Sequence, residues 1–286
     1  MKLSLIGIGL MGKPMAISLL ERGYELYVYN RTQSKTEELK EKGAVIADSS
    51  NQLIKLTDTI ITMLSNYDAI KNVLFNNNND FAGKTIVQMS TIAPDESLEL
   101  KANIEKLKGK YIEAPVLGSI PQIKAGELII LVGGSLELYN RFHELLEVWG
   151  SKIIHVGEVG KAAALKLALN QLIISETTAF AMSLGYVRKT GVDVNMFMDI
   201  LRGSALYAPT FDKKLQRYLK RDFSNPNFPV KHLLKDLNII SENFGKEKIN
   251  NQILEATKQI LHRAIDEGLS DADYSALYNI INPKTN

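Results

Sequence analysis

The pattern of apolar and polar residues along the chain changes near residue 157. Before it, short runs rich in β-branched and aromatic residues alternate with segments whose apolar residues recur every three or four positions. The predicted strands are residues 3–6, 24–29, 59–64, 85–89, 111–113, 128–132 and 152–155. Because strands that alternate with helices build βαβ units, we expect an α/β domain with a mostly parallel sheet.

After residue 158 the strand pattern is absent, and helical periodicity continues to about residue 281. Breaks are predicted at residues 190–191, 221–229 and 267–270. Gly157 and Gly160 let the chain leave the last strand and enter a long helix. The pattern therefore predicts two domains, residues 1–157 and an all-α part, residues 158–286.

The composition is that of an ordinary globular protein of about two domains, with 286 residues, 45% hydrophobic and 23% charged. The absence of cysteine excludes a disulfide scaffold, a zinc–cysteine cluster and a cysteine nucleophile. A net charge of +2 offers no basic footprint for nucleic acid. The histidines lack metal-ligand spacing, so we expect no metal.

The sequence also bears on membranes and secretion. The most apolar stretch, residues 162–187, is interrupted by Lys166, Asn170 and Glu176, which is atypical of a bilayer span. The apolar run at the start soon meets Gly7 and is too short for a secretory signal. We therefore expect a soluble, cytoplasmic protein with no membrane partner.

A glycine-rich loop, Gly7-Ile8-Gly9-Leu10-Met11-Gly12, follows the first predicted strand and opens a helix. In such a loop the first glycine permits a tight turn, the second lets the backbone approach a pyrophosphate, and the third allows close helix–strand packing. The alternative is a glycine-rich turn of another α/β protein. The strand before the loop and the helix after it favour dinucleotide binding, and hence a Rossmann domain.

The position that reads the ribose follows the second predicted strand and holds Asn30-Arg31-Thr32. An NAD site places Asp or Glu here. Since no carboxylate is present and the Arg31 guanidinium can fork onto phosphate oxygens, this tripeptide favours NADP(H). The alternative is that Arg31 is only a solvated cation at a helix start. Further residues assigned to the cofactor site are Leu10, Met11, Leu64, Ser65 and Thr91.

Residues 162–174 predict a helix that is apolar on nearly all faces, which implies burial. Lys166 and Asn170 stand four residues apart and share one face. Because burial lowers the pKa of a lysine, Lys166 is suited to proton transfer near neutral pH. The alternative is a lysine that extends its ammonium to the surface.

Two further segments follow predicted strands, at the edge where open α/β sheets bind ligands. They are residues 90–92, which include Thr91, and residues 113–119, where Gly118 can bring N–H groups close to a small anion. An ordinary strand-to-loop turn fits each local sequence equally well. Their position relative to the glycine-rich loop favours function.

Together these motifs resemble the β-hydroxyacid dehydrogenase family nearly from end to end. Residues 7–16 resemble its cofactor motif, and residues 30–32 are similar to the tripeptide of its NADPH-dependent glyoxylate/succinic semialdehyde reductase branch. Residues 157–170 resemble its catalytic segment, which implies Lys166 as the acid/base and Asn170 as a residue that holds the substrate. The resemblance also implies a helical second domain with homodimer or homotetramer contacts.

Residues 228–237 resemble the helix that closes over nicotinamide and substrate in that branch. The resemblance implies Lys235 near the cofactor and Phe228 and Asp236 beside the substrate. As an isolated charge pair, Lys235-Asp236 would more often lie on a solvated face.

The chain departs from the family where Leu117-Gly118-Ser119 replaces Ser-Gly-Gly, because the first hydroxyl is lost. Leu117 makes the pocket more apolar, while backbone N–H donors can survive the change. The residues assigned to the substrate are Thr91, Leu117, Gly118, Ser119, Phe228 and Asp236.

The expected activity is hydride transfer from NADPH to a small aldehyde acid of the glyoxylate or succinic semialdehyde class. Alternatives are an NAD(P)-dependent 3-hydroxyisobutyrate-type dehydrogenase and a reductase of uncharged carbonyls or imines. Lys166 argues against imine reductases, which usually lack it, and the helical part is too short for a 6-phosphogluconate-type decarboxylase. A non-catalytic nucleotide-binding module is the other class, but it has no need of a buried lysine.

Overall fold

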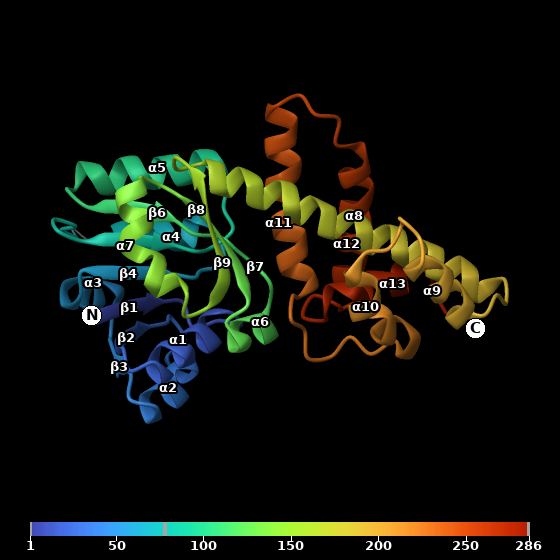
Figure 1. Cartoon of the computed structure of the whole chain (residues 1–286), viewed down its shortest axis with the longest axis horizontal. Coiled ribbons are helices and arrows are strands. Elements are labelled where there is room, and N and C mark those ends of the chain that lie inside the picture. Colours follow the sequence, from blue (N-terminus) through green and yellow to red (C-terminus); the bar gives the residue numbers. More distant parts are fainter. Residues whose placement is uncertain (1, 77–78, 285–286) are drawn as a thin grey trace. The chain divides into compact units, whose positions relative to one another are not determined.

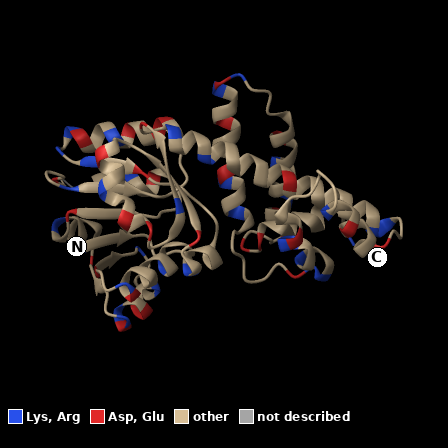
Figure 2. Cartoon of the chain, viewed as in Figure 1, with Lys and Arg blue, Asp and Glu red and all other residues tan. Residues whose placement is uncertain are grey.

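The computed structural model describes residues 2–76 and 79–284. The chain divides into two compact units, Met1–Lys166 and Leu167–Asn286 (Figure 1). Lys, Arg, Asp and Glu are interspersed over each unit (Figure 2). No described helix is both long and apolar enough to cross a bilayer.

The first unit is built on a sheet that has nine strands within the described residues. The strands β3-β2-β1-β4-β5-β6 are parallel neighbours in that order. Strand β8 pairs antiparallel with both β6 and β7, and it pairs parallel with β9. The strands are β1 (Lys2–Ile6), β2 (Glu25–Tyr29), β3 (Val45–Ile46), β4 (Thr59–Thr62), β5 (Thr85–Gln88), β6 (Lys110–Glu113), β7 (Val116–Leu117), β8 (Leu128–Gly133) and β9 (Gly150–Gly157). The predicted α/β class with a mostly parallel sheet is confirmed.

Helices cover both faces of this sheet, which explains why β4 and β5 are buried along their whole length (Figure 1). One core contains Met15, Phe142 and Trp149, and the Trp149 indole N–H donates to the Met15 carbonyl at 3.0 Å. The other core contains Leu53 and Leu100. The helices of this unit are α1 (Gly12–Glu21), η1 (Gln33–Thr36), α2 (Glu37–Glu41), α3 (Ser50–Leu56), α4 (Tyr67–Phe75), α5 (Pro94–Lys106), α6 (Ile120–Ala125) and α7 (Leu136–Leu146).

Within the described residues, the named elements of the second unit are all helices, as predicted. Three helices end at Lys189, Lys220 and Asp266, where the sequence predicts breaks; the breaks at residues 203–208 and 247–251 were not predicted. The elements are α8 (Lys161–Lys189), α9 (Val194–Arg202), α10 (Pro209–Lys220), α11 (Val230–Lys246), α12 (Gln252–Asp266), η2 (Tyr274–Ala276) and α13 (Leu277–Ile281).

Helix α8 is continuous, and the division between the units falls inside it rather than at residue 157. Its first turn is bound to β6 of the first unit, because backbone N–H groups of Gly160, Ala162 and Ala163 donate to the Glu113 carboxylate. The boundary predicted at residues 157–158 therefore differs from the division of the chain into compact units, and it stays a prediction.

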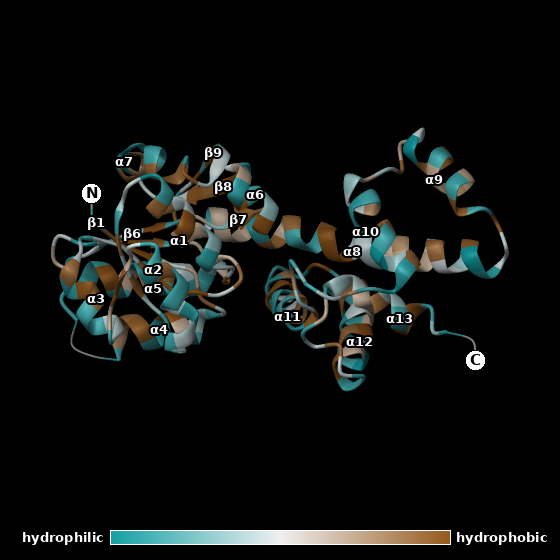
Figure 3. Ribbon diagram, turned by 90° about the horizontal axis from the view of Figure 1, so that it is seen from below, coloured by the Kyte–Doolittle hydropathy of each residue, from teal (hydrophilic) through white to brown (hydrophobic). Residues whose placement is uncertain are grey.

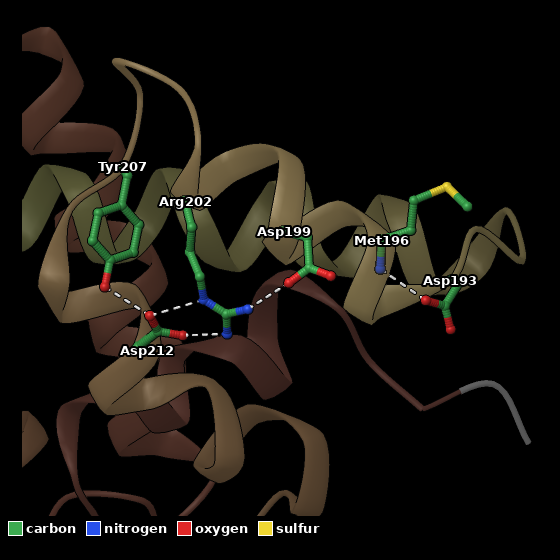
Figure 4. A network of polar contacts seen from close by, with 6 residues as sticks. All are labelled: Asp193, Met196, Asp199, Arg202, Tyr207 and Asp212. Carbon is green, nitrogen blue, oxygen red and sulfur yellow. Dashed lines mark hydrogen bonds and ion pairs between the residues drawn. The ribbon is translucent and has the colours of Figure 1, made fainter.

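Polar contacts join α9 to α10 across the break at residues 203–208. The Arg202 guanidinium binds the Asp212 carboxylate at 2.7 Å and Asp199 at 2.9 Å, and the Tyr207 hydroxyl donates to Asp212 at 2.7 Å (Figure 4). Asp193 accepts the Met196 N–H at 2.8 Å and caps α9 (Figure 4). These contacts set the direction in which α10 leaves the turn.

A buried ion pair lies in the core of the second unit. The Lys214 ammonium is 2.7 Å from the Asp273 carboxylate and 4.0 Å from the centre of the Tyr274 ring. The Asp273 carboxylate also accepts the Ser275 N–H. Burial works to raise the pKa of Asp273, but Lys214 and Ser275 outweigh it and hold this pKa below its usual value. The carboxylate is therefore ionised in the folded protein at neutral pH.

Candidate active site

The glycine-rich loop joins β1 to α1 at the carboxyl edge of the sheet. Gly7 has a φ of +105°, and its N–H donates to the Tyr29 carbonyl at 3.0 Å. A Cβ on Gly7 would lie 2.2 Å from the Met63 carbonyl oxygen, and one on Gly12 would lie 1.8 Å from the Gly7 carbonyl oxygen. Backbone contact thus requires glycine at both positions.

Gly9 differs from these two glycines. It is exposed, and a Cβ placed on it would meet no described atom within 4 Å. The protein itself therefore gives no reason for glycine here, whereas a pyrophosphate lying on the N-terminus of α1 does. This open space is the structural observation that fits the loop to a dinucleotide.

The Asn30 side chain connects the loop to the ribose position. Its Oδ1 accepts the Ile8 N–H at 3.0 Å, and its Nδ2 donates to the Thr32 carbonyl at 2.8 Å. Arg31 and Thr32 are exposed beside it, at the end of β2. Asn30 therefore shapes the loop, and Arg31 presents a charge to solvent at the position predicted to read the ribose.

The turns after β4 and β5 lie side by side because these strands are parallel neighbours. The Ser90 hydroxyl accepts the Leu64 N–H at 2.7 Å, and the Gln88 amide donates to the Ser90 carbonyl at 3.1 Å. Ser65 is exposed and Thr91 is half-buried at this edge. The hydrogen bond that Ser90 accepts fixes the turn, which is the role that the alternative of an ordinary strand-to-loop turn gives to a hydroxyl of residues 90–92.

Among the substrate candidates of the first unit, Leu117 lies in β7 and pairs with Ile129 of β8. Gly118 has a φ of +123° and is exposed. The Ser119 N–H and hydroxyl both donate to the Gln122 side-chain oxygen, at 3.0 and 2.9 Å. Both donors of Ser119 are therefore engaged at the start of α6.

On α8, Lys166 and Asn170 are one turn apart and 8% and 4% exposed. Burial of Lys166 excludes the interpretation that it extends to the surface. The Asn170 amide donates to the Asp236 carboxylate at 2.8 Å, and Asp236 also lies 2.6 Å from the Lys235 ammonium. Asp236, 3% exposed, is not on a solvated face, because its carboxylate connects Asn170 to Lys235.

Phe228 precedes α11 and is half-buried. Its ring stacks on His232, with centroids 6.5 Å apart, and packs edge-on against Tyr274 at 5.8 Å. Burial, reinforced by the charges of Lys235 and Lys231, lowers the pKa of His232 below its ordinary value. His232 is therefore neutral at neutral pH and packs as an aromatic ring.

The structure also shows that Glu113, the first residue of the predicted segment 113–119, is a buried carboxylate, to which the sequence assigned no role. Glu113 Oε1 accepts N–H groups from Gly160 at 2.8 Å, Ala162 at 2.9 Å and Ala163 at 3.2 Å, while the Ser97 hydroxyl donates to Oε2. Burial raises the pKa of Glu113, and these hydrogen bonds oppose that rise. The described residues contain no group of three or more His, Asp or Glu arranged to hold a metal ion.

Comparisons with known proteins show which family the chain resembles. The NAD binding domain of 6-phosphogluconate dehydrogenase matches residues 2–157, and the model described as NAD-binding of NADP-dependent 3-hydroxyisobutyrate dehydrogenase matches residues 160–281. Glyoxylate/succinic semialdehyde reductase 1 of Arabidopsis thaliana is 32% identical over 285 residues, covering 98% of each chain. The 2-hydroxy-3-oxopropionate reductase of Escherichia coli is 32% identical over 282 residues, covering 97% of this chain and 96% of that one.

Among solved structures, 3-hydroxyisobutyrate dehydrogenase from Salmonella typhimurium has the same fold, with a TM-score of 0.86 at 20% identity over 98% of this chain and 99% of that one. The full-length matches at 32% identity and the two family models confirm the resemblance seen in the sequence. The chain belongs to the β-hydroxyacid dehydrogenase family of nicotinamide-dependent oxidoreductases.

Proposed function

We propose that the protein is an NADP(H)-dependent reductase that converts a small aldehyde acid, of the glyoxylate or succinic semialdehyde class, to its hydroxy acid. The observation that carries the proposal is the buried Lys166 one turn before Asn170, whose amide is held by Asp236. The named activities of the two relatives described above support the substrate class.

When bound, the nicotinamide supplies the hydride. We propose that Lys166 donates a proton to the carbonyl oxygen of the substrate during reduction and removes that proton during oxidation. Asn170 has one amide N–H engaged by Asp236, so the orientation of its amide is fixed and its remaining polar atoms can align the substrate oxygen. Phe228 and Thr91 remain proposed neighbours of the substrate.

The test is Lys166→Ala, with Lys161→Ala as the matched control, because Lys161 is an exposed lysine on the same helix. We expect Lys166→Ala to lower kcat by a factor of about 10²–10⁴, the usual contribution of a general acid. NADPH affinity should stay within about threefold by fluorescence titration, a change below 1 kcal/mol. Retention of most of the turnover would contradict the role of Lys166.

The preference for NADP(H) is proposed from Arg31, which is exposed at the end of β2 where no carboxylate follows the strand. Gly7, Gly9, Leu10, Met11 and Gly12 would receive the pyrophosphate, with Asn30, Thr32, Leu64, Ser65, Thr91 and Lys235 around the remaining cofactor. Arg31→Ala should weaken NADPH binding and leave NADH binding unchanged. Lys35→Ala, which removes a nearby exposed cation, should change neither.

A second candidate is reduction of uncharged carbonyl compounds. It is favoured by Leu117 in β7 and by the engagement of both Ser119 donors with Gln122, which leaves fewer groups to hold a substrate carboxylate. NADPH oxidation with glyoxylate, succinic semialdehyde, methylglyoxal and uncharged aldehydes separates the two. Faster turnover of the acids supports the first candidate, and turnover of uncharged aldehydes alone supports the second.

We further propose that residues 1–157 bind the cofactor, that residues 158–286 bind substrate and associate, and that the protein is a cytoplasmic homodimer or homotetramer. The helices α8 and α9 carry apolar segments (Figure 3), and their exposed apolar side chains support association. The most exposed of these are Met182, Tyr186, Met196 and Ile200. Light scattering after gel filtration measures the subunit number.

A further inference from the structure

We propose that Glu113 is a positioning residue, which holds the first turn of α8 against the sheet and thereby places Lys166 for proton transfer. The inference rests on the proposed function, because it gives Glu113 a part in the same reaction. Glu113 lies at the end of β6, is 0% exposed, and belongs neither to the glycine-rich loop nor to the proposed substrate contacts.

The geometry is that of a helix cap supplied by a distant strand. A helix begins with N–H groups that lack partners within the helix, and a local side chain usually accepts them. Here one oxygen of Glu113 accepts three of these groups from a position 47 residues earlier than Gly160. Three hydrogen bonds to one buried oxygen therefore hold the helix start against β6.

The surroundings of the carboxylate are fitted to this contact. A Cβ on Gly133, the residue of β8 paired with Glu113, would lie 2.3 Å from Oε1, so glycine leaves the space that the carboxylate occupies. Ser97 of α5 donates to the other oxygen and lies 2.9 Å from the Tyr111 hydroxyl. Both oxygens therefore accept hydrogen bonds, and Oε1 accepts them from the start of α8.

The contact bears on catalysis because Lys166 follows closely on the same helix. Lys166 lies three positions after Ala163, a rise of about 4.5 Å along the axis. Since α8 is continuous, a shift of its first turn moves Lys166 with it. Misplacement of a reacting group by about 1 Å can lower a rate about 100-fold.

The experiment compares Glu113→Ala and Glu113→Gln with Ser97→Ala. Ser97→Ala is the matched control because it removes a hydrogen bond to the same carboxylate and leaves the three bonds to α8. We expect Glu113→Ala to lower kcat about 100-fold with little change in KM for NADPH. Glu113→Gln should recover most of kcat, because its amide oxygen can accept the same N–H groups, and Ser97→Ala should keep kcat within about threefold.

Hydrogen exchange of the amides of residues 160–166 is the second readout. It should accelerate in Glu113→Ala and stay slow in Glu113→Gln and Ser97→Ala. If Glu113→Ala does not fold, Glu113→Asp, whose carboxylate is retracted by one methylene, takes its place with the same expected directions.

A kcat of Glu113→Ala, or of Glu113→Asp where it takes its place, within twofold of the kcat of Ser97→Ala would overturn the proposal. If the wild type reduces no carbonyl compound, the proposed function fails by itself. In that case hydrogen exchange alone tests whether Glu113 holds the start of α8. Unchanged protection of the amides of residues 160–166 in Glu113→Ala would refute that contact.

Discussion

Gly9→Ala separates the requirement of the fold from the requirement of the cofactor. Gly9 is exposed, its φ is outside the left-handed region, and a Cβ there meets no described atom within 4 Å. Alanine therefore fits the loop without strain. In such a place it stabilises the fold by about 0.4–1 kcal/mol, because the unfolded chain loses freedom.

The effect on binding has the opposite sign. If the pyrophosphate lies on Gly9, the added methyl group overpacks that contact at a cost of about 1–3 kcal/mol. This corresponds to a rise of about 5- to 150-fold in the Kd for NADPH. The stabilisation corresponds to a rise in Tm of roughly 1–4 °C for a chain of this size.

The assay is fluorescence titration with NADPH beside thermal unfolding without cofactor. Gly203→Ala is the control, because Gly203 has a φ of −80° and its added Cβ would lie an ordinary 3.5 Å from the Asp199 carbonyl oxygen. It should leave the Kd unchanged. Gly12→Ala, with its Cβ 1.8 Å from backbone, should lower Tm as well as affinity. A Kd within twofold of the wild type for Gly9→Ala would refute the placement of the pyrophosphate.

Three further predictions concern pH, the core and the loop. Because burial and neighbouring lysines lower the pKa of His232, the unfolded chain binds more protons than the folded protein below about pH 6.5. The free energy of unfolding should therefore fall below this pH by at most about 1.4 kcal/mol per pH unit. His232→Gln should reduce the difference between the free energies of unfolding measured in urea at pH 7.5 and 5.5. Lys214→Met leaves the Asp273 charge buried without its partner and should lower the free energy of unfolding in urea by about 3–5 kcal/mol. Adding Asp273→Asn should restore part of this stability, and a loss below about 1 kcal/mol in Lys214→Met would contradict the role of the pair. Asn30→Ala removes the acceptor of a loop N–H and should weaken NADPH and NADH binding alike in titrations, unlike Arg31→Ala; selective loss of NADPH would show that Asn30 reads the phosphate instead.

The sequence predicts the parts of the fold whose signal is local. The buried runs of β4 and β5 are long enough to be recognised, and so are the helix ends at Lys189 and Lys220. The strands β3 and β7 have two residues each, too few to show a period. They are strands because neighbours pair with them, as β8 does with Leu117.

The site divides in the same way. The glycine-rich loop is predictable because its three glycines lie at a fixed spacing between a strand and a helix, within six residues of the sequence. The burial of Lys166 follows from the apolar helix around it. The contacts of Glu113 with α8 and of Asp236 with Asn170 join residues 47 or more positions apart, and no periodicity marks them. The engagement of Ser119 by Gln122 depends on the geometry of the turn that begins α6.

The continuous helix α8 limits where halves of related enzymes can be exchanged. A junction in the glycine stretch at residues 157–160 separates Glu113 from the helix turn it binds. A junction between Lys166 and Asn170 takes these two residues, which are one helical turn apart, from different parents. Joining the parents between Ala164 and Leu165 keeps the Glu113 contact from one parent and Lys166, Asn170 and Asp236 from the other. Chimaeras for altering substrate choice are therefore best spliced within this helix, not in the loop that precedes it.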